Sequence, residues 1–385
     1  MERPIIVIHY HEIALKGGNR ERFERQLIEN IRWALRSLGD VRVQRMSGRI
    51  VVRRCAIEQI EDIVQKLQKV FGIQNILVGV EVAQEVESLR LAATTCAESF
   101  AQDATFAVRV KRGNKQFPMT SMELERDLGA AVVESSGRKV KLQQPTFTVY
   151  VEIVERTAFV FTRKIVGPGG LPTGVSGRVL MLLSSGFDSP VASWMLMKRG
   201  CIVDALHFHS YPHTSDSSQQ NVRALMGVIN DWQQQRGTLR MCALADYQRE
   251  VVTGAPSPLR VLLYRRMMLR IAERTAKALG ALALATGESV GQVASQTLAN
   301  MQAVGAILST LLLRPLCGMD KDEILRLARQ IGTAEISERP YDDCCTLFIP
   351  ERPETRASVA ALDRAEAQLD VAQWVDRLVV ETSSS

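Results

Sequence analysis

The segment that most constrains the fold of this chain runs from residue 178 to residue 208. An apolar run (179–183) breaks into a turn of small polar residues, SSGFDS (184–189), and a helical pattern then runs from Pro190 to Gly200. A second apolar run, 201–208, follows at once. Proline at the first helical position after a serine cap, with glycine just past the end, is the usual punctuation of a helix. The segment therefore predicts a strand–turn–helix–strand unit.

The turn at residues 184–189 has the composition of an anion-binding loop. Small residues let backbone N–H groups and the helix N-terminus face an anion, which is normally phosphate. Neither the G-x-x-x-x-G-K-[ST] pattern of Walker loops nor the G-x-G-x-x-G pattern of dinucleotide-binding folds is present. An ordinary turn with serine caps is the alternative interpretation, and the turn alone does not separate the two.

Length, charge and cysteine content narrow the class of protein. A chain of 385 residues is long enough for two or three domains. Lys and Arg outnumber Asp and Glu by 48 to 42, a modest excess that permits a polyanionic partner. The N-terminus has no secretory pattern, and the longest uncharged stretch, 289–313, is interrupted by amides and predicts a loop and a buried helix, with no membrane span. Seven scattered cysteines form no disulfide framework, so we expect a cytoplasmic protein.

The first third of the chain alternates strand and helix patterns. The order is strand 4–13, helix 20–38, a hairpin over 41–53 that turns at Ser47-Gly48, helix 57–71 and strand 75–82. This βαββαβ order predicts a small ferredoxin-like domain. A second α/β module follows, with helix 86–102, strand 105–110, helix 120–135 and paired strands over 139–164. A glycine- and proline-rich stretch, 167–174, predicts a linker.

Basic residues are dense in this N-terminal half. They form three groups: Arg42, Arg45, Arg49, Arg53 and Arg54; Arg109, Lys111, Arg112 and Lys115; and Arg138, Lys139 and Lys141. Each group alone is typical of a solvated face. Three groups together favour a track for a phosphate backbone, and the lack of an aromatic-rich platform favours structured RNA or a DNA helix over single strands.

Five motifs, taken in order, give the chain a family resemblance. They are YHEIALKGGNR (10–20), KRGNKQFPMTS (111–121), HFHSYP (207–212), GESVGQVASQ (287–296) and PYDDCC (340–345). Together with the 184–189 turn, which resembles the S-G-G-x-D-S pyrophosphate loop of AMP-forming enzymes, they resemble the tRNA 4-thiouridine sulfurtransferases. The 111–121 segment resembles the tRNA-binding THUMP domain. The family usually has Gly where this chain has His11 and Ser185.

The resemblance implies a multidomain α/β fold. We expect a ferredoxin-like domain (1–60), a THUMP domain (61–165), a linker (166–177) and a PP-loop ATP pyrophosphatase domain with a doubly wound parallel sheet (178–385). The chain is expected to be the short form of the family, without a rhodanese domain. Lys111, Arg112 and Lys115 are the predicted tRNA-binding residues.

The implied activity is ATP-dependent replacement of O4 by sulfur in a tRNA uridine, at position eight, to give 4-thiouridine. Adenylation of O4 makes AMP the leaving group, and pyrophosphate is released. The implied partners are tRNA, a cysteine desulfurase that supplies persulfide, and a thiazole sulfur-carrier protein that takes sulfur for thiamine biosynthesis. A homodimer is left open.

The same resemblance assigns the nucleotide site. The positions matched to ATP contacts are Leu183, Ser184, Gly186, Ser189, Phe208, His209, Arg265, Gly287 and Gln296. Asp188 is the expected Mg²⁺ ligand and Lys321 the cation for charge developing on phosphate. An acid at a helix N-terminus and a surface lysine are the structural alternatives for these two. His207, His209 and His213 could form a zinc cluster, but no acidic or cysteine ligand lies nearby in the sequence.

Cys344 is the predicted sulfur-carrying residue, with Cys345 as the alternative. Both follow Pro340 in a loop-like context that predicts an exposed thiol, although Asp342 and Asp343 would raise its pKa. The other five cysteines are predicted packing residues. Two other functions stay open: a different AMP-forming tRNA-modifying enzyme or amidotransferase-like ligase, and a non-catalytic RNA-binding protein with a decayed ATP site.

Overall fold

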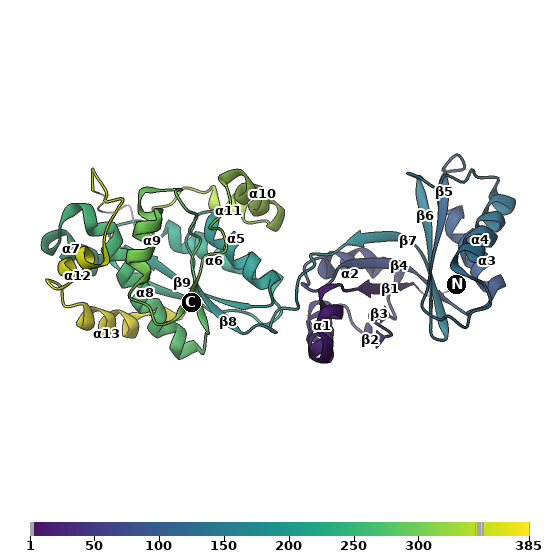
Figure 1. Ribbon diagram of the computed structural model, residues 1–385, viewed down its shortest axis with the longest axis horizontal. Helices are drawn as coiled ribbons and strands as arrows, with labels where there is room; N and C mark the ends of the chain where they lie inside the picture. The colour runs from purple at the N-terminus through teal and green to yellow at the C-terminus, as the bar shows by residue number, and fades with distance from the viewer. Residues whose placement is uncertain (1–3, 343, 345–347, 349, 385) are drawn as a thin grey trace. The chain divides into compact units, whose positions relative to one another are not determined.

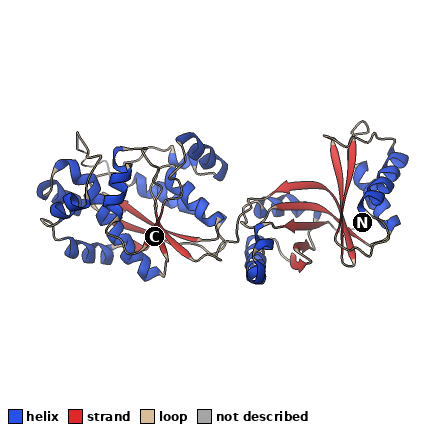
Figure 2. Cartoon of the chain, in the orientation of Figure 1, coloured by secondary structure: helices blue, strands red, loops and turns tan. Residues whose placement is uncertain are grey.

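The structure is a computed structural model that describes residues 4–342, 344, 348 and 350–384, and it divides into two compact units (Figure 1). Unit 1 is Met1–Pro172 and unit 2 is Thr173–Ser385. Each unit is built around its own β-sheet, which helices cover (Figure 2). Within the described part of the chain, no helix combines the length and the apolar character needed to cross a membrane.

Unit 1 contains one seven-stranded sheet in the order β2-β3-β1-β4-β7-β6-β5. Its strands are β1 (Ile5–His9), β2 (Arg42–Met46), β3 (Arg49–Arg53), β4 (Asn75–Val82), β5 (Phe106–Arg112), β6 (Phe147–Val154) and β7 (Thr157–Val166). Every neighbouring pair is antiparallel except β5 and β6, which are parallel. The order β2-β3-β1-β4 is that of a ferredoxin-like domain, which confirms the βαββαβ prediction.

The helices of unit 1 cover its sheet in two groups, each over its own apolar core. Helices α1 (Arg20–Leu35) and α2 (Ile60–Leu67) pack on β1–β4, whereas α3 (Val86–Glu98) and α4 (Ser121–Ser136) pack on β5–β7. Because the apolar residues between Ile60 and Ile76 belong to the first core, this packing favours a first domain boundary near residue 76 instead of residue 60.

The hairpin turn was predicted at its actual position. Ser47 and Gly48 have φ values of 36° and 78°, the positive pair that a tight two-residue hairpin requires. Both ends of the predicted linker are held by backbone hydrogen bonds. The Gly167 and Gly169 N–H groups donate to Gln74 and Ile73 in unit 1, and the Gly174 and Ser176 N–H groups donate to the Gly200 carbonyl in unit 2.

Unit 2 contains a six-stranded sheet in the order β12-β11-β8-β9-β10-β13. Its strands are β8 (Arg178–Leu182), β9 (Ile202–His209), β10 (Leu239–Ala243), β11 (Ala283–Ala285), β12 (Leu311–Leu313) and β13 (Ser383–Ser384). All pairs are parallel except β10 with β13. The chain proceeds from β8 through β9 to β10 and then crosses to β11 on the other side of β8. The switch point of the sheet therefore lies between β8 and β11, where ligands bind in such folds.

Helices cover both faces of this sheet, as a doubly wound fold requires (Figure 1). One group contains α5 (Asp188–Lys198), α6 (Ser217–Trp232), α10 (Lys321–Ile331) and α11 (Ala334–Ser337). The other contains α7 (Ala245–Gly254), α8 (Arg260–Leu279), α9 (Leu298–Gly305), α12 (Val359–Glu366) and α13 (Val371–Glu381).

The predicted start of α5 was wrong by two residues. The helix begins at Asp188, and Pro190 occupies its first turn. Ser189 is not the cap, because its hydroxyl is used by the preceding loop: it accepts a hydrogen bond from the Ser184 N–H at 2.8 Å. The hydrogen bond to the Ser184 N–H therefore takes the place of the helix cap that the sequence predicts for Ser189.

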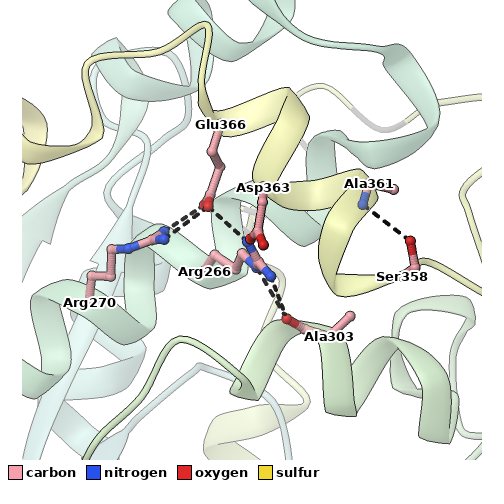
Figure 3. A network of polar contacts seen from close by, with 7 residues as sticks. All are labelled: Arg266, Arg270, Ala303, Ser358, Ala361, Asp363 and Glu366. Carbon is pink, nitrogen blue, oxygen red and sulfur yellow. Dashed lines mark hydrogen bonds and ion pairs between the residues drawn. The ribbon is translucent and has the colours of Figure 1, made fainter.

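A buried arginine joins three helices of unit 2 (Figure 3). Arg266 on α8 is fully buried and donates to Asp363 and Glu366 on α12 at 2.7 and 2.8 Å. Its Nε and second amino group also donate to the Ala303 carbonyl on α9, and Arg270 shares the Glu366 carboxylate. Removing one partner from such a buried network leaves the others without a counter-charge.

We expect Arg266→Ala to lower the free energy of unfolding of unit 2 by about 3 kcal/mol or more. Denaturant unfolding followed by tryptophan fluorescence in a Trp33→Phe background measures it, because the other three tryptophans lie in unit 2. Arg274→Ala is the matched control on the same helix. It loses an exposed ion pair to Asp376 and should cost less than about 1 kcal/mol. Equal losses in the two variants would contradict the proposed importance of the network.

Candidate active site

A pocket of about 340 Å³ opens at the carboxyl ends of β8, β9 and β11, at the switch point of the sheet. Ten residues that sequence analysis singled out line it: Leu183, Ser184, Gly186, Asp188, Ser189, Phe208, Arg265, Gly287, Gln296 and Cys344. They come from segments as far apart in the sequence as Leu183 and Cys344, and the folded sheet brings them together. His209 and Lys321 are not in the lining, but the Lys321 ammonium reaches the Asp188 carboxylate at 2.9 Å.

The phosphate-loop turn is held by its own hydroxyl groups. The Ser184 and Ser189 hydroxyls lie 3.1 Å apart, and Ser184 is exposed toward the opening. The loop after β11 approaches it so closely that a Cβ on Gly287 would lie 2.6 Å from the Ser189 nitrogen and 2.8 Å from the Asp188 carbonyl carbon. Only glycine fits there. Gly287 is therefore required for packing, besides its predicted role in nucleotide binding.

Ser185, which replaces the glycine usual in this motif, is accommodated by a specific contact. Its side chain is buried and its hydroxyl donates to the Ser218 carbonyl at the start of α6, at 3.0 Å. Ser185 is not among the residues with positive φ, so its side chain causes no backbone strain. The serine therefore bonds the loop to α6 and leaves the backbone conformation of the loop unstrained.

Asp188 is held between two side chains that donate to it. Lys321 donates to one carboxylate oxygen at 2.9 Å and the Gln292 amide to the other at 3.1 Å. A single carboxylate is an adequate protein ligand for Mg²⁺ when phosphate oxygens and water complete the shell. Asp188 fits that ion, since its side chain is one quarter exposed and faces the pocket. No cluster of three acidic, histidine or cysteine side chains suited to a metal occurs among the described residues.

A buried carboxylate that the sequence analysis missed organises the base of the pocket. Glu288 pairs with Arg265 and, at 2.7 Å, with Arg314, and it accepts a hydrogen bond from Thr286 at 2.8 Å. Burial alone would raise the pKa of Glu288, but the two guanidinium groups outweigh burial and hold that pKa below its usual range. Arg265 is thus fixed by Glu288 and by Ser295, and not on a solvated helix face. The sequence feature that could have pointed to Glu288 is an acidic residue directly after Gly287, at the end of a predicted buried strand.

Two glutamines present unused acceptors at the pocket. The Oε1 atoms of Gln292 and Gln296 are buried and have no hydrogen-bond partner among the described residues. Because buried polar atoms are normally paired, these two atoms suit a ligand that carries N–H or O–H donors. Gln292 was not predicted.

Of the two histidines at the end of β9, His207 is hydrogen-bonded within the protein through both ring nitrogens. One ring nitrogen of His207 contacts the Leu183 carbonyl at 2.9 Å and the other contacts the Ser218 hydroxyl at 3.3 Å, so neither is available to zinc. Burial, and then the charge of Arg223, lowers the pKa of His209 below its usual value, so this ring is neutral at pH 7.

Cys344 is not the exposed thiol of the predicted pair, but it does lie at the pocket. The residue is buried and packs in the apolar core of unit 2, while it also lines the pocket. Cys345 and Asp343 lie outside the described residues. Cys55, Cys201 and Cys242 are buried, as predicted for packing residues, and burial raises the pKa of Cys55 to about 11 and of Cys242 to about 12. Cys317 was predicted as a packing residue but is exposed.

The basic groups of unit 1 differ in how much charge they present. In the hairpin, Arg45, Arg49, Arg53 and Arg54 pair with Glu24, Glu152, Glu81 and Asp40 respectively. Arg138 is buried and donates to the Phe100 carbonyl at 2.7 Å. These five guanidinium groups are therefore already engaged within unit 1.

The 111–121 segment keeps exposed charge. Lys111 and Lys115 are exposed and make no ion pair with the part of the chain that the structure describes. Arg112 is half-buried and donates to the Phe117 and Met119 carbonyls at 3.0 and 2.7 Å. Its guanidinium shapes the loop that follows Lys111 and carries Lys115.

Comparisons with known proteins agree with this architecture. Residues 174–371 match the thiamine biosynthesis protein family ThiI, residues 5–76 the ThiI ferredoxin-like domain, and residues 83–163 the THUMP domain. A probable tRNA sulfurtransferase of Caldanaerobacter subterraneus subsp. tengcongensis is 43% identical over 98% of this chain and 99% of its own length. Another, of Moorella thermoacetica, is 41% identical over 96% and 94%.

Two solved structures are also similar. The crystal structure of a 4-thiouridine synthetase in complex with RNA and ATP matches with a TM-score of 0.90 and 34% identity, over 100% of this chain and 99% of that one. The protein PH1313 of Pyrococcus horikoshii matches with a TM-score of 0.68 and 22% identity, over 86% of this chain and 99% of that one, a likeness of fold alone.

Proposed function

This chain belongs to the ThiI family of tRNA sulfurtransferases, and we propose that it uses ATP to convert a tRNA uridine, at position eight, to 4-thiouridine. The observation that carries the proposal is that Cys344 lines the same pocket as the phosphate-loop residues Ser184, Gly186 and Ser189. A thiol and a nucleotide cradle at one site suit a reaction in which activation precedes sulfur transfer.

The chemistry proceeds in two stages. The uridine O4 attacks the α-phosphorus of ATP, pyrophosphate leaves, and O4 becomes part of a good leaving group. The terminal sulfur of a Cys344 persulfide then attacks C4, and AMP departs with the former O4. A thiol reductant cleaves the resulting disulfide between Cys344 and the base, which frees 4-thiouridine and the cysteine.

The pocket residues take the parts that this scheme needs. The exposed Ser184 and the loop N–H groups face the phosphates. Lys321 is 47% exposed, so its ammonium can turn from Asp188 toward a phosphate and offset the charge that develops there. The acceptor atoms of Gln292 and Gln296 suit the exocyclic amine of adenine. Phe208 supplies apolar lining, with His209 just beyond it.

The proposed metal is Mg²⁺, and Asp188 is the residue that would hold it together with phosphate oxygens. Bound there, it would neutralise phosphate charge. Lys321 and Gln292 already orient the Asp188 carboxylate, so the protein presets the position of this ligand.

The partners follow from the same proposal. Unit 1 binds tRNA through Lys111 at the end of β5 and Lys115 in the loop that follows, and Arg112 supports this loop. A cysteine desulfurase supplies the persulfide. A Cys344 persulfide can also serve a thiazole sulfur-carrier protein in thiamine biosynthesis, and a homodimer stays open.

Two alternative functions are less well supported. Ser185 is accommodated in the phosphate loop by its hydrogen bond to Ser218, which argues against a decayed ATP site. An AMP-forming enzyme of another class would lack the THUMP match at residues 83–163.

Asp188→Asn should lower tRNA-dependent formation of AMP and pyrophosphate by about 100-fold or more, because it removes the metal-binding charge at nearly constant volume. Binding of tRNA, measured by filter retention, should not change. Asp322→Asn removes an exposed carboxylate from the first turn of α10 and should leave both measurements at wild-type values. Release of ADP and phosphate by the wild-type enzyme would overturn the assignment.

In the full chain, Lys111→Ala together with Lys115→Ala should flatten the dependence of log K on log salt by roughly one to two units, since each lost phosphate contact removes about 0.9. Equilibrium tRNA binding at several salt concentrations measures this slope. Arg54→Gln is the control, because Asp40 already neutralises that charge. An unchanged slope in the double variant would remove this loop from the tRNA interface.

Cys344→Ser should leave tRNA-dependent AMP release intact and abolish 4-thiouridine, because a hydroxyl cannot carry sulfane sulfur. Mass spectrometry of tRNA nucleosides measures the product, and circular dichroism checks the fold. Cys317→Ser, which changes an exposed thiol, should keep full activity. Undiminished 4-thiouridine in Cys344→Ser would exclude this residue, and the same test on Cys345 would then be decisive.

A further inference from the structure

A fully buried glutamine connects Cys344 to the edge of the parallel sheet. The Gln248 amide nitrogen donates to the Cys344 carbonyl at 2.7 Å. Its amide oxygen accepts a hydrogen bond from the Ser210 hydroxyl at 2.6 Å. Gln248 and Ser210 are both 0% exposed, so the hydrogen bond between them is shielded from solvent.

The two anchoring residues sit at neighbouring strand ends. Ser210 directly follows β9, and Gln248 lies in the first turns of α7, which starts just after β10. The Leu244 N–H donates to the His209 carbonyl at 2.8 Å, so the start of α7 is hydrogen-bonded to the end of β9. Gln248 is outside the pocket lining. Its amide thus links Cys344 to the rigid sheet from behind the pocket.

The helix that carries Gln248 is itself held on its outer side. Tyr247 is fully buried and its ring meets the Trp374 ring edge-on, with centroids 5.8 Å apart. The Trp374 indole donates to Glu250 at 2.8 Å, and Arg377 pairs with Asp246 at 3.1 Å. Through these contacts α13 fixes α7, and the Gln248 amide has a defined position.

A purely structural role does not account for a polar group here. Burying an amide costs free energy that hydrogen bonds only offset, and an apolar side chain of the same size would fill the core without that cost. The amide adds two directional hydrogen bonds: its oxygen is held by Ser210, and its nitrogen holds the carbonyl of Cys344. A displacement of about 1 Å can cost a reaction about 100-fold.

We propose that Gln248 is a positioning residue for sulfur transfer, which holds the Cys344 thiol against the pocket through the carbonyl of Cys344. This inference rests on the proposed sulfur-carrying role of Cys344. Activation of the uridine by ATP does not need the thiol, so the contribution of Gln248 falls on the second stage alone.

The informative variant is Gln248→Glu. An ionised glutamate keeps the bond from Ser210 but cannot donate to the Cys344 carbonyl, whereas a protonated one can do both. Burial raises the pKa of such a carboxyl, so lowering the pH restores the donor. The measured quantity is 4-thiouridine formed per AMP released, relative to wild type at the same pH.

At about pH 9.5, above the raised pKa of the buried carboxyl, this ratio should fall about tenfold in Gln248→Glu, the cost of one lost buried hydrogen bond, and it should recover as the pH is lowered. Gln248→Met has no donor at any pH, so its ratio should stay low throughout. Release of AMP should remain within about twofold of wild type in both variants. Ser215→Ala is the matched control, since it removes an exposed contact to Asp342 in the same region, and its ratio should not change.

The outcomes distinguish the positioning role of Gln248 from the proposed sulfur-carrying role of Cys344. An unchanged ratio in both Gln248 variants, or a parallel loss of AMP release and thiolation, overturns the positioning role. Cys344→Ser is run alongside. If that variant still makes 4-thiouridine, the proposed function of Cys344 fails; if it makes none while the Gln248 variants keep the wild-type ratio, only the positioning inference fails.

Discussion

The contact between two loops at the switch point of the sheet sets the geometry on which unit 2 depends. Gly287, at the end of β11, presses against the backbone of Asp188 and Ser189 at distances that exclude any Cβ. This contact brings the phosphate loop, the metal-ligand candidate and the acceptor glutamines to one pocket. Because the strands are parallel, their carboxyl ends meet at the same edge, and the loops there are free to vary while the sheet stays fixed.

Helix α8 connects the site to the core through two consecutive arginines. Arg265 faces the pocket and is held by Glu288, while Arg266 faces inward and binds α9 and α12 (Figure 3). Neighbouring residues on a helix point in directions about 100° apart, so one helix can serve both surfaces. Helix α13 in the same way holds α7 in place through the Trp374–Glu250 hydrogen bond, and Gln248 on α7 donates to the Cys344 carbonyl. The far side of unit 2 therefore supports the groups that would carry out the chemistry.

Sequence patterns predicted the secondary structure well where periodicity and turn chemistry agree. The ferredoxin-like order, the Ser47-Gly48 turn and strand β4 over Asn75–Val82 follow from alternation, glycine and helix-ending signals. The start of α5 did not, because Ser189 binds the loop instead of capping the helix. Charge density alone does not show which arginines are paired: those of the hairpin have acidic partners on other elements, such as Glu24, Glu81 and Glu152, and no local pattern reveals these pairs.

The sequence by itself determined the fold class, the phosphate loop and the residues expected around the nucleotide, because each rests on local spacing or on motifs that survive as short runs. Only the tertiary structure decided how these residues are supported. Glu288 is defined by two arginines from different elements, Cys344 is buried although its flanking residues predict a loop, and Gln248 gains meaning only through Ser210 and Cys344. Contacts between residues 23 to 96 positions apart leave no periodic trace, since nothing in local conformation depends on them until the sheet has formed.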